Sequence, residues 1–292
     1  MKASAFAYAR ATSVVHALEL LAARGDRAKV LSGGQSLMPA MNLRLISPEF
    51  IVDISELDEL RGIAVSGDLL VIGALTRHAD LLRSPQIAAH APLLTEAVVH
   101  VGHPAIRNRG TLGGSLAHAD PASELPACML ALDATIVIRG KSGARRVAAA
   151  AFFKGIYETV LSADELLVAV ELPIARKNST HFFCEFARRH GDYAIVGLAA
   201  QATVEGSLFK NLRLAFFAVG DRPVLAKAAN RLVNVDVTAA LVSGASAALG
   251  EELTPHDDHQ ASPAMRRHLA EVLFRRCVST LLHHPGFAGA VG

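Results

Sequence analysis

The chain reads Ile-Arg-Asn-Arg-Gly-Thr-Leu-Gly-Gly-Ser over residues 106–115, and a shorter run of the same kind, Ser-Gly-Gly-Gln-Ser, occupies residues 32–36. A Gly-Gly step lets backbone N–H groups approach a phosphate because no Cβ stands in the way, and serine or threonine hydroxyls add donors. One such run alone is more often a tight turn. Two runs with matching hydroxyls favour a site that grips a pyrophosphate from two sides.

Neither run fits the familiar dinucleotide signatures. Gly33-Gly34 lacks the third glycine of a Rossmann turn, and Pro39 argues against a helix directly after the run. The chain also contains no GxxxxGK[ST] pattern. The sequence therefore predicts a phosphate site of another architecture.

Outward from the first run, the N-terminal residues read as a β-α-β unit. Thr12 or Ser13 can cap a helix that Gly25 ends in the left-handed conformation. Strands are expected at residues 29–31 and 50–54. The apolar face of the helix is expected to consist of Val14, Val15, Leu18 and Leu21.

A second unit begins near residue 57. Hairpins are expected about residues 66–68 and 141–143, and a strand over 166–172 that ends at Pro173. Helices are expected from Thr76, over 92–101 and over 123–132. Strands at 182–187, 195–204 and 212–219 then precede a last helix with Ser262 as cap and Pro263 at its first position. Its apolar face is expected to hold Met265, Leu269, Val272 and Leu273.

Composition excludes several classes of protein. With 51% hydrophobic and 19% charged residues, the 292-residue chain is expected to form packed cores in two domains. Its net charge of +2, without a basic block, argues against nucleic-acid binding. Its apolar runs are shorter than the roughly 20 residues of a membrane span, and no secretory signal is recognisable. Cys128, Cys184 and Cys277 form no CxxC pair, which fits a reducing cytoplasm and leaves iron–sulfur chemistry to a partner.

Three motifs together resemble one family. They are residues 32–39 with Arg44, Pro48 and 52–54; residues 106–115 through Asp120-Pro121 and Ser123-Glu124; and residues 188–194. In this order they resemble the FAD-binding medium subunits of molybdenum hydroxylases, the xanthine dehydrogenase family that includes carbon monoxide, nicotine and caffeine dehydrogenases. The resemblance covers essentially the whole chain.

The resemblance implies an α+β fold. A vanillyl-alcohol-oxidase-like (PCMH-type) FAD-binding domain is expected over residues 1–175, with lobes at about 1–56 and 57–175. A C-terminal antiparallel-sheet domain with helices is expected over 176–292. We place the boundary in the polar, basic segment 174–180.

The resemblance also implies a site for a non-covalent FAD. The two glycine runs would bind the pyrophosphate, Glu124 would contact the adenosine end, and Tyr193 would lie against the isoalloxazine ring. No catalytic residue and no metal ligand is expected. The expected cofactor-binding residues are Ser32, Gly33, Gly34, Gln35, Ser36, Leu37, Val101, Gly102, Thr111, Gly113, Gly114, Ser115, His118, Asp120, Glu124, Leu161 and Tyr193.

Some of these residues also have a plain structural interpretation. Asp120 before Pro121 is an ordinary helix-start signal, Tyr193 could be a core aromatic, and His118 could be a polar loop residue. His256, His259 and the pair His283-His284 are expected at the surface rather than on a metal. Several relatives carry a lysine a few residues before the paired arginines, where this chain has residues 184–186 without one.

The resemblance implies an oxidoreductase subunit that relays electrons in a cytoplasmic enzyme. A small subunit with [2Fe-2S] clusters would supply electrons, a large subunit with the molybdenum cofactor would oxidise the substrate, and the assembly would be a dimer of heterotrimers. A stand-alone FAD-dependent oxidase or dehydrogenase of the same superfamily is the alternative. A third interpretation, a degenerate scaffold subunit, is disfavoured by the intact glycines and hydroxyls of both runs.

Overall fold

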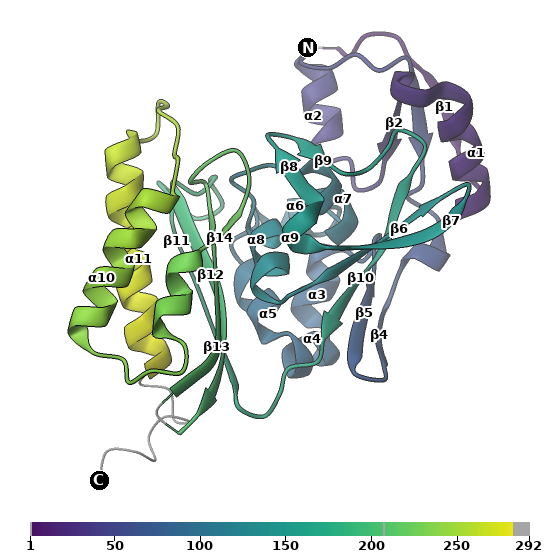
Figure 1. Ribbon diagram of the computed structural model, residues 1–292. Coiled ribbons are helices and arrows are strands. Elements are labelled where there is room, and N and C mark those ends of the chain that lie inside the picture. Colours follow the sequence, from purple (N-terminus) through teal and green to yellow (C-terminus); the bar gives the residue numbers. More distant parts are fainter. Residues whose placement is uncertain (1, 207, 283–292) are drawn as a thin grey trace.

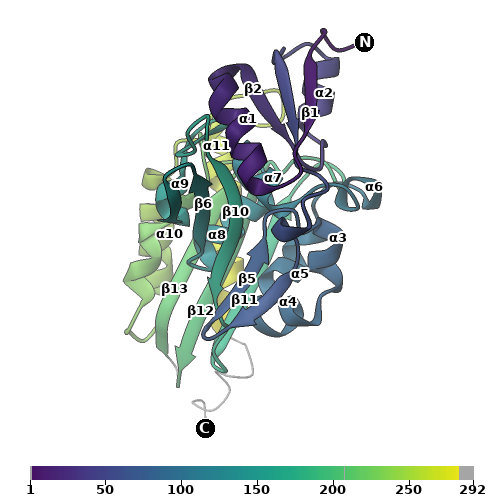
Figure 2. The ribbon, with the colours of Figure 1, turned by 90° about the vertical axis from the view of Figure 1, so that its right-hand side faces the viewer.

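The structure, a computed structural model, describes residues 2–206 and 208–282. Three main sheets follow one another along the chain, and helices fill the space between the second and third sheets (Figure 1). The N-terminal lobe stands at one end of the molecule, as the view of Figure 2 shows, and α7 (Leu112–His118) lies near its junction with the rest.

The N-terminal lobe is a parallel sheet in the order β1-β3-β2. This confirms the predicted β-α-β unit. Its elements are β1 (Ala7–Arg10), α1 (Val14–Arg24), β2 (Ala28–Leu31), α2 (Leu37–Asn42) and β3 (Phe50–Asp53).

Three details of this lobe differ from the sequence prediction. Val15 is 53% exposed and Ala17 is buried, because positions 14, 17, 18 and 21 share the face of α1 that packs on the sheet and position 15 does not. Gly25 has positive φ but ψ of −138°, outside the left-handed helical region. Pro39 does not prevent a helix, because it lies in the first turn of α2, where a backbone N–H has no intrahelical acceptor.

The middle unit is a five-stranded antiparallel sheet in the order β4-β5-β10-β6-β7. Both predicted hairpins are confirmed. The first helix begins at His78 rather than Thr76, since the Thr76 hydroxyl donates to the Gly62 carbonyl instead of capping. The strands are β4 (Ile63–Ser66), β5 (Leu69–Gly73), β6 (Thr135–Gly140), β7 (Gly143–Ala148) and β10 (Leu166–Pro173), with the small hairpin β8 (Phe153–Gly155) and β9 (Glu158–Thr159). The helices are α3 (His78–Arg83), α4 (Pro85–His90), α5 (Pro92–Val98), α6 (Pro104–Arg107), α7, α8 (Glu124–Ala131) and α9 (Ala149–Phe152).

The C-terminal unit is an antiparallel sheet in the order β11-β12-β13-β14, covered on one side by α10 and α11 (Figure 1). On α11 the prediction of Met265 as a core residue was wrong: it is 49% exposed, and the buried face runs through Ala270, Leu273 and Phe274. The elements are β11 (Ser179–Phe186), β12 (Val196–Glu205), β13 (Leu208–Phe217), β14 (Val224–Leu225), α10 (Ala239–Glu252) and α11 (Pro263–Leu282).

The C-terminal sheet is buried on both faces. Leu198 and Phe216 pack into the core under α10 and α11, whereas Ala199 and Phe217, one residue further along each strand, belong to the core of the middle unit. Gly197 allows this arrangement, because a Cβ there would overlap the Phe217 ring. One sheet therefore contributes to two cores. Among the helices of residues 2–206 and 208–282, none combines the length and the apolar character that crossing a bilayer requires.

Candidate functional site

The two glycine runs meet in space. The Ser32 Oγ and Thr111 Oγ1 atoms are 3.1 Å apart and share a hydrogen bond across the junction of lobe and middle unit. A Cβ on Gly33 would lie 2.2 Å from the Arg109 carbonyl oxygen, and one on Gly114 would lie 2.8 Å from both hydroxyl oxygens. Glycine is therefore required at both positions for the two runs to touch.

The second run is a helix start rather than an open loop. Thr111 caps α7 by accepting a hydrogen bond from the Gly114 N–H. Gly113 is buried, and its N–H donates to the Ala74 carbonyl at 2.8 Å, where a Cβ would lie 2.6 Å from the Ala74 side chain. The segment that follows β5 thus holds the beginning of α7 in place.

The backbone N–H groups differ between the two runs. From Leu112 to Ser115 each one already has an acceptor: Thr76 O, Ala74 O, Thr111 Oγ1 and Thr111 O. Those of residues 33–37 donate to no group in the described part of the chain, and Gly34 has φ of +73°. Consecutive free amides around a left-handed residue form an anion-binding concavity. The first run therefore offers amides, and the second offers hydroxyls.

His78 lies beneath the second run and was not predicted from the sequence. It is 5% exposed, and a Cβ on Gly110 would lie 3.0 Å from its ring. Neither ring nitrogen has a hydrogen-bond partner of good geometry in the described chain. Burial lowers the pKa of His78 to about 4, and the nearby charge of Arg107 adds to the effect, so the ring is neutral at physiological pH. No periodicity or motif distinguishes it from an ordinary core residue.

The predicted residues Val101 and Gly102 lie in a turn that Arg107 organises. Arg107 Nη1 donates to the carbonyls of Val99, Val101 and Gly102 at 3.1, 3.2 and 2.8 Å. The third motif packs on this turn, since a Cβ on Gly191 would lie 3.1 Å from the Gly102 carbonyl oxygen. The turn thus brings the C-terminal motif to the middle unit.

Asp120 stands at the centre of an aromatic cluster. One of its oxygens accepts from the Ala122 N–H, as the helix-start interpretation requires. Burial, together with the negative charge of Asp120, raises the pKa of Tyr193 to about 12. Burial also raises the pKa of Tyr157, again helped by Asp120. Tyr193 is nevertheless 61% exposed, which makes it a surface aromatic rather than a core one.

Tyr157 is the residue of this cluster that sequence reasoning missed. Its ring stacks on His118 with the centroids 4.8 Å apart, and it has φ of 56°, a strained value for a residue with a side chain. Its N–H donates to the carbonyl of Ala119, which has φ of 50° itself. Burial lowers the pKa of His118. Only the tertiary fold brings the β8–β9 hairpin tip to the end of α7.

Glu124 occupies the first position of α8 and is 8% exposed. Burial, together with the negative charges of Glu185 and Asp120, raises its pKa to about 8. The charge of Glu124 in turn raises the pKa of Tyr193. Glu124 therefore lies close enough to Tyr193 for its charge to act on the phenol.

The remaining predicted residues lie in the two glycine runs and, for Leu161, beside the middle core. Ser115 Oγ is 3.1 Å from Ser123 Oγ, and Gln35 Nε2 donates to the Gly33 carbonyl at 3.0 Å. Ser36 precedes α2, and Leu37 is its first residue. Leu161 follows β9 and packs, half-buried, against the middle core.

Metal ligands are not gathered anywhere in residues 2–206 and 208–282. His256 pairs with Asp221, and His283 and His284 lie outside the described residues. The three cysteines are free thiols on α8, β11 and α11.

Comparison with known families covers nearly the whole chain. Residues 4–175 match the family described as the FAD binding domain in molybdopterin dehydrogenase. Residues 181–281 match the CO dehydrogenase flavoprotein C-terminal domain.

Individual relatives agree with these matches. The chain is 38% identical to subunit alpha of the 6-hydroxypseudooxynicotine dehydrogenase complex of Paenarthrobacter nicotinovorans, over 97% of this chain and 96% of that one. It is 34% identical to the carbon monoxide dehydrogenase medium chain of Hydrogenophaga pseudoflava, over 94% and 96%.

Solved structures show the same fold. Carbon monoxide dehydrogenase from Hydrogenophaga pseudoflava, in a form that lacks the Mo-pyranopterin moiety of its cofactor, matches with a TM-score of 0.94 and 35% identity, over 96% of this chain and 98% of that one. Quinoline 2-oxidoreductase from Pseudomonas putida 86 matches with a TM-score of 0.89 and 38% identity, over 97% and 98%.

Proposed function

The chain belongs to the family of FAD-binding medium subunits of molybdenum hydroxylases, and we propose that it passes electrons from iron–sulfur clusters of a partner subunit to an external acceptor. One observation carries the cofactor part of this proposal. The free amides of residues 33–37 form an anion-binding concavity directly beside the hydroxyls of Ser32 and Thr111. The chain is thus an oxidoreductase subunit that transfers electrons and does not itself bind the substrate.

The residues present fit the pyrophosphate of FAD. Gly34 is left-handed, Gly33 and Gly114 have no room for a Cβ, and the donors around them are neutral amides and hydroxyls. Such donors can bind two phosphates without a lysine or a metal ion. We therefore assign the pyrophosphate to residues 32–37 together with Thr111, Gly114 and Ser115, while Gly113 supports the helix start.

We assign the isoalloxazine ring to the cluster around Asp120. Tyr193 is the exposed aromatic that can lie against a flat ring, with His118 and Tyr157 beside it. Glu124 is buried at the first position of α8, and we propose it as a further cofactor contact. We propose that Val101, Gly102 and Leu161 line the remaining wall of the site.

When bound, FAD supplies the two-electron redox chemistry, and the protein positions it and tunes its potential. The chain's residues act around it. The amides of residues 33–37 would hold the phosphates, Tyr193 would limit access to the ring, and the charge of Asp120 acts on the Tyr193 hydroxyl. His78 is buried and neutral, so Arg107 is not joined by a second positive charge under the glycine run.

We propose two partners: a small subunit that carries [2Fe-2S] clusters and a large subunit that carries the molybdenum cofactor and the substrate, assembled as a dimer of heterotrimers. The names of the relatives support this, since they are medium chains or complex subunits. The free thiols on separate elements also support a partner for the clusters and a cytoplasmic location. We further propose a division of the chain into an FAD-binding domain (1–175, with lobes 1–56 and 57–175) and a C-terminal domain (176–292).

The cofactor assignment is tested by Gly34→Asp with Gly67→Asp as the matched control. Both glycines have positive φ, but Gly67 lies in an open hairpin turn. The Cβ of an aspartate at Gly34 would lie 3.2 Å from Leu31 Cδ1 and 3.4 Å from Met38 Cγ, and its carboxylate would add a negative charge to the run that we assign to the pyrophosphate. A repulsion of about 3 kcal/mol weakens FAD binding about a hundredfold. The Kd from fluorescence titration is expected to rise for Gly34→Asp alone. Equal Kd values for both variants would show that the first run is only a turn.

The relay is tested against a stand-alone oxidase by anaerobic reduction. The isolated FAD-loaded chain is mixed with aldehydes, N-heterocycles and alcohols, and flavin absorbance is followed. We expect no rapid bleaching without partner subunits, and stable association with a two-cluster iron–sulfur protein. Fast reduction by any of these compounds would favour an independent oxidase.

A further inference from the structure

Strand β11 lies at the edge of the C-terminal sheet, next to β12 alone. The Val204 N–H donates to the Asn178 carbonyl at 3.0 Å, directly before the first paired residues of the two antiparallel strands. Hydrogen-bonded and non-hydrogen-bonded pairs alternate along such strands, so the even-numbered residues of β11 bond to β12. The backbone N–H and C=O groups of His181, Phe183 and Glu185 therefore point away from the sheet.

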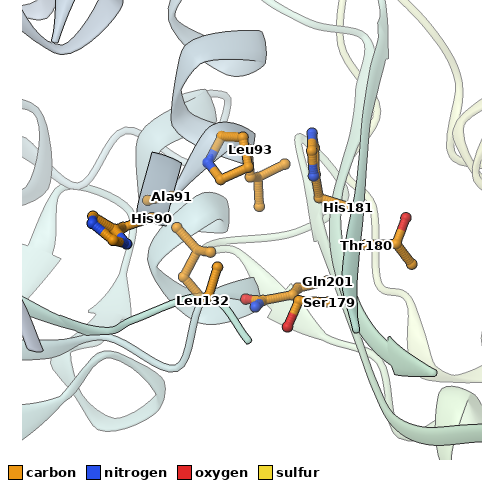
Figure 3. Close-up of a pocket in the computed structure, with 10 residues that line it drawn as sticks. His90, Ala91, Leu93, Leu132, Ser179, Thr180, His181 and Gln201 are labelled. Atoms are coloured by element: carbon orange, nitrogen blue, oxygen red, sulfur yellow. The ribbon is translucent and has the colours of Figure 1, made fainter. Parts of the chain in front are cut away.

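Both faces of β11 are covered, whereas this edge has no partner strand. Phe182 packs in the core under α10 and α11, and Phe183 packs against the core of the middle unit. Figure 3 shows the same alternation at the start of the strand, where Ser179 and Thr180 point to opposite sides. In residues 2–206 and 208–282, the outward N–H groups of β11 from residue 181 to 185 donate to no acceptor. An edge of this kind is a template for another strand.

A groove of about 360 Å³ follows the edge. Its lining consists of Glu96, Val99 and His100 from α5 and the turn after it, residues 181–183 of β11, and Thr280 of α11. A neighbouring cavity of about 20 Å³ shares His181 and has room for about one water molecule (Figure 3). The edge is therefore recessed between a helix of the middle unit and a helix of the C-terminal unit.

The shape of the groove selects a single strand. A second copy of the chain would bring its own α5 and α11 along with its β11, and these helices would meet the walls of the groove before the two edges could pair. A lone extended segment carries no flanking helices and can lie about 4.8 Å from β11. Residues 181–185 offer it a length of about 16 Å.

The walls of the groove are acidic. Glu96 is 51% exposed, and its Oε1 atom lies 3.2 Å from His181 Nε2. Glu185 Oε1 lies 3.3 Å from His100 Nδ1, while its buried Oε2 atom has no hydrogen-bond partner in the described chain. The described residues that line the groove include no lysine or arginine. Two carboxylates beside histidines complement a segment that carries a lysine or arginine.

The source of the segment is indicated by sequence. Residues 283–292 contain Pro285, three glycines and no lysine or arginine, which is a poor composition for a strand that faces Glu96. The relatives named above are a medium chain and a subunit of a complex, so such proteins function beside other chains.

We propose that the free edge of β11 binds an extended segment of a partner subunit by strand addition, with a lysine or arginine of that segment against Glu96. Backbone hydrogen bonds to residues 181, 183 and 185 supply affinity, and the charge of Glu96 supplies selectivity. That the partner is a subunit of the assembly rests on the proposed function, whereas the groove does not depend on FAD.

The first test measures binding of fluorescein-labelled peptides to the full-length chain by anisotropy. The probe is Val-Thr-Val-Lys-Val-Thr-Val, and its partner probe has glutamate in place of lysine. We expect the lysine peptide to bind at least about tenfold more tightly, because attraction to Glu96 is replaced by repulsion in the other. Glu96→Lys should reverse this preference. The control Glu19→Lys, on the exposed side of α1, should keep it.

The second test asks whether the bond is a backbone ladder. Amide hydrogen exchange by NMR should be fast at His181, Phe183 and Glu185 in the free chain and slow with the lysine peptide bound. A lysine peptide that is N-methylated on alternate residues should not bind, since it cannot donate to the strand edge. Slow exchange of these amides in the free chain, no binding of the lysine peptide at millimolar concentration, or an unchanged preference in Glu96→Lys would refute the proposed site.

The third test identifies the occupant in the purified multisubunit complex. Val99 is replaced by photoreactive benzoylphenylalanine, and the cross-linked peptide is sequenced by mass spectrometry. A lysine- or arginine-bearing segment of another subunit is expected. A cross-link to residues 283–292 or to a second copy of this chain, or no cross-link at all, would refute a partner segment in the groove. A chain that purifies without other subunits would instead refute the proposed function, and the peptide titrations would still decide whether the groove binds a strand.

Discussion

Replacing Gly33 by alanine tests whether the contact between the two glycine runs builds the site. The added Cβ would lie 2.2 Å from the Arg109 carbonyl oxygen and 2.9 Å from the Gly110 Cα. Both neighbours are backbone atoms, so no side chain can rotate away. The overlap is relieved only if the two backbones separate by about 1 Å. Overpacking of this kind costs about 1–3 kcal/mol, and the cost is at the upper end of this range when the neighbouring atoms are rigid.

The separation also breaks the hydrogen bond between Ser32 and Thr111, which is 3.1 Å long. Its loss adds about 1 kcal/mol. If FAD binding requires the two runs to touch, a total of about 4 kcal/mol weakens binding between a hundredfold and a thousandfold. The same free energy lowers the melting temperature of the apo chain by roughly 10 °C.

The assay is FAD titration together with thermal unfolding of Gly33→Ala. Gly244→Ala is the control, since Gly244 lies in α10 with open space where an added methyl group would sit. That variant is expected to bind FAD normally and to gain up to about 1 kcal/mol of stability from helix propensity. A Gly33→Ala protein with the wild-type Kd and melting temperature would refute the view that this contact shapes the site.

Three further outcomes are expected. His78→Gln should remove an acid sensitivity: because the folded pKa is lowered to about 4, the wild type loses up to about 3 kcal/mol as pH falls from 6.5 toward 4, measurable by denaturant titration at several pH values. Arg266→Ala should destabilise the chain by about 3–5 kcal/mol, because buried Arg266 donates to the Ala218 carbonyl at 2.9 Å and pairs with Asp258; exposed Arg275→Ala should cost under about 0.5 kcal/mol. Tyr193→Ala should keep FAD but change its potential and reoxidation rate, and unchanged values would assign Tyr193 a packing role.

The sequence predicted strands and glycine contacts well because both depend on local chemistry. The two glycine runs that the sequence singles out do meet in the structure, and alternating apolar residues mark the hairpins. The prediction of buried residues was wrong where burial depends on the surface that a helix packs against. Val15 faces solvent although Val14, Ala17 and Leu18 on α1 are buried. The expectation that Pro39 would prevent a helix was also wrong, since Pro39 lies in the first turn of α2, the part of a helix that tolerates proline.

The sequence indicated only some of the residues that surround the glycine runs. Tyr157 and His100 carry no local motif, and each reaches its partner only through tertiary contact, with His118 and with Glu185 respectively. The sequence singled out Glu124, but not the effect of its charge on Tyr193, because one sequence gives no distance between two residues so far apart along the chain. Residues whose role comes from a distant neighbour leave no periodicity to detect.

The sheet that serves two cores restricts how this protein can recombine. Chimeras that join the N-terminal part of one relative to the C-terminal part of another near residue 175 would exchange half of a packed core, since Phe217 and Ala199 fill the middle unit. A foreign partner would meet these side chains with unmatched shapes. Swaps are therefore expected to succeed only when the inward-facing residues of β12 and β13 travel with the helices α5 and α8 that cover them. Substitutions at these shared core positions are therefore expected to be tolerated in matched pairs, one in each half of the chain.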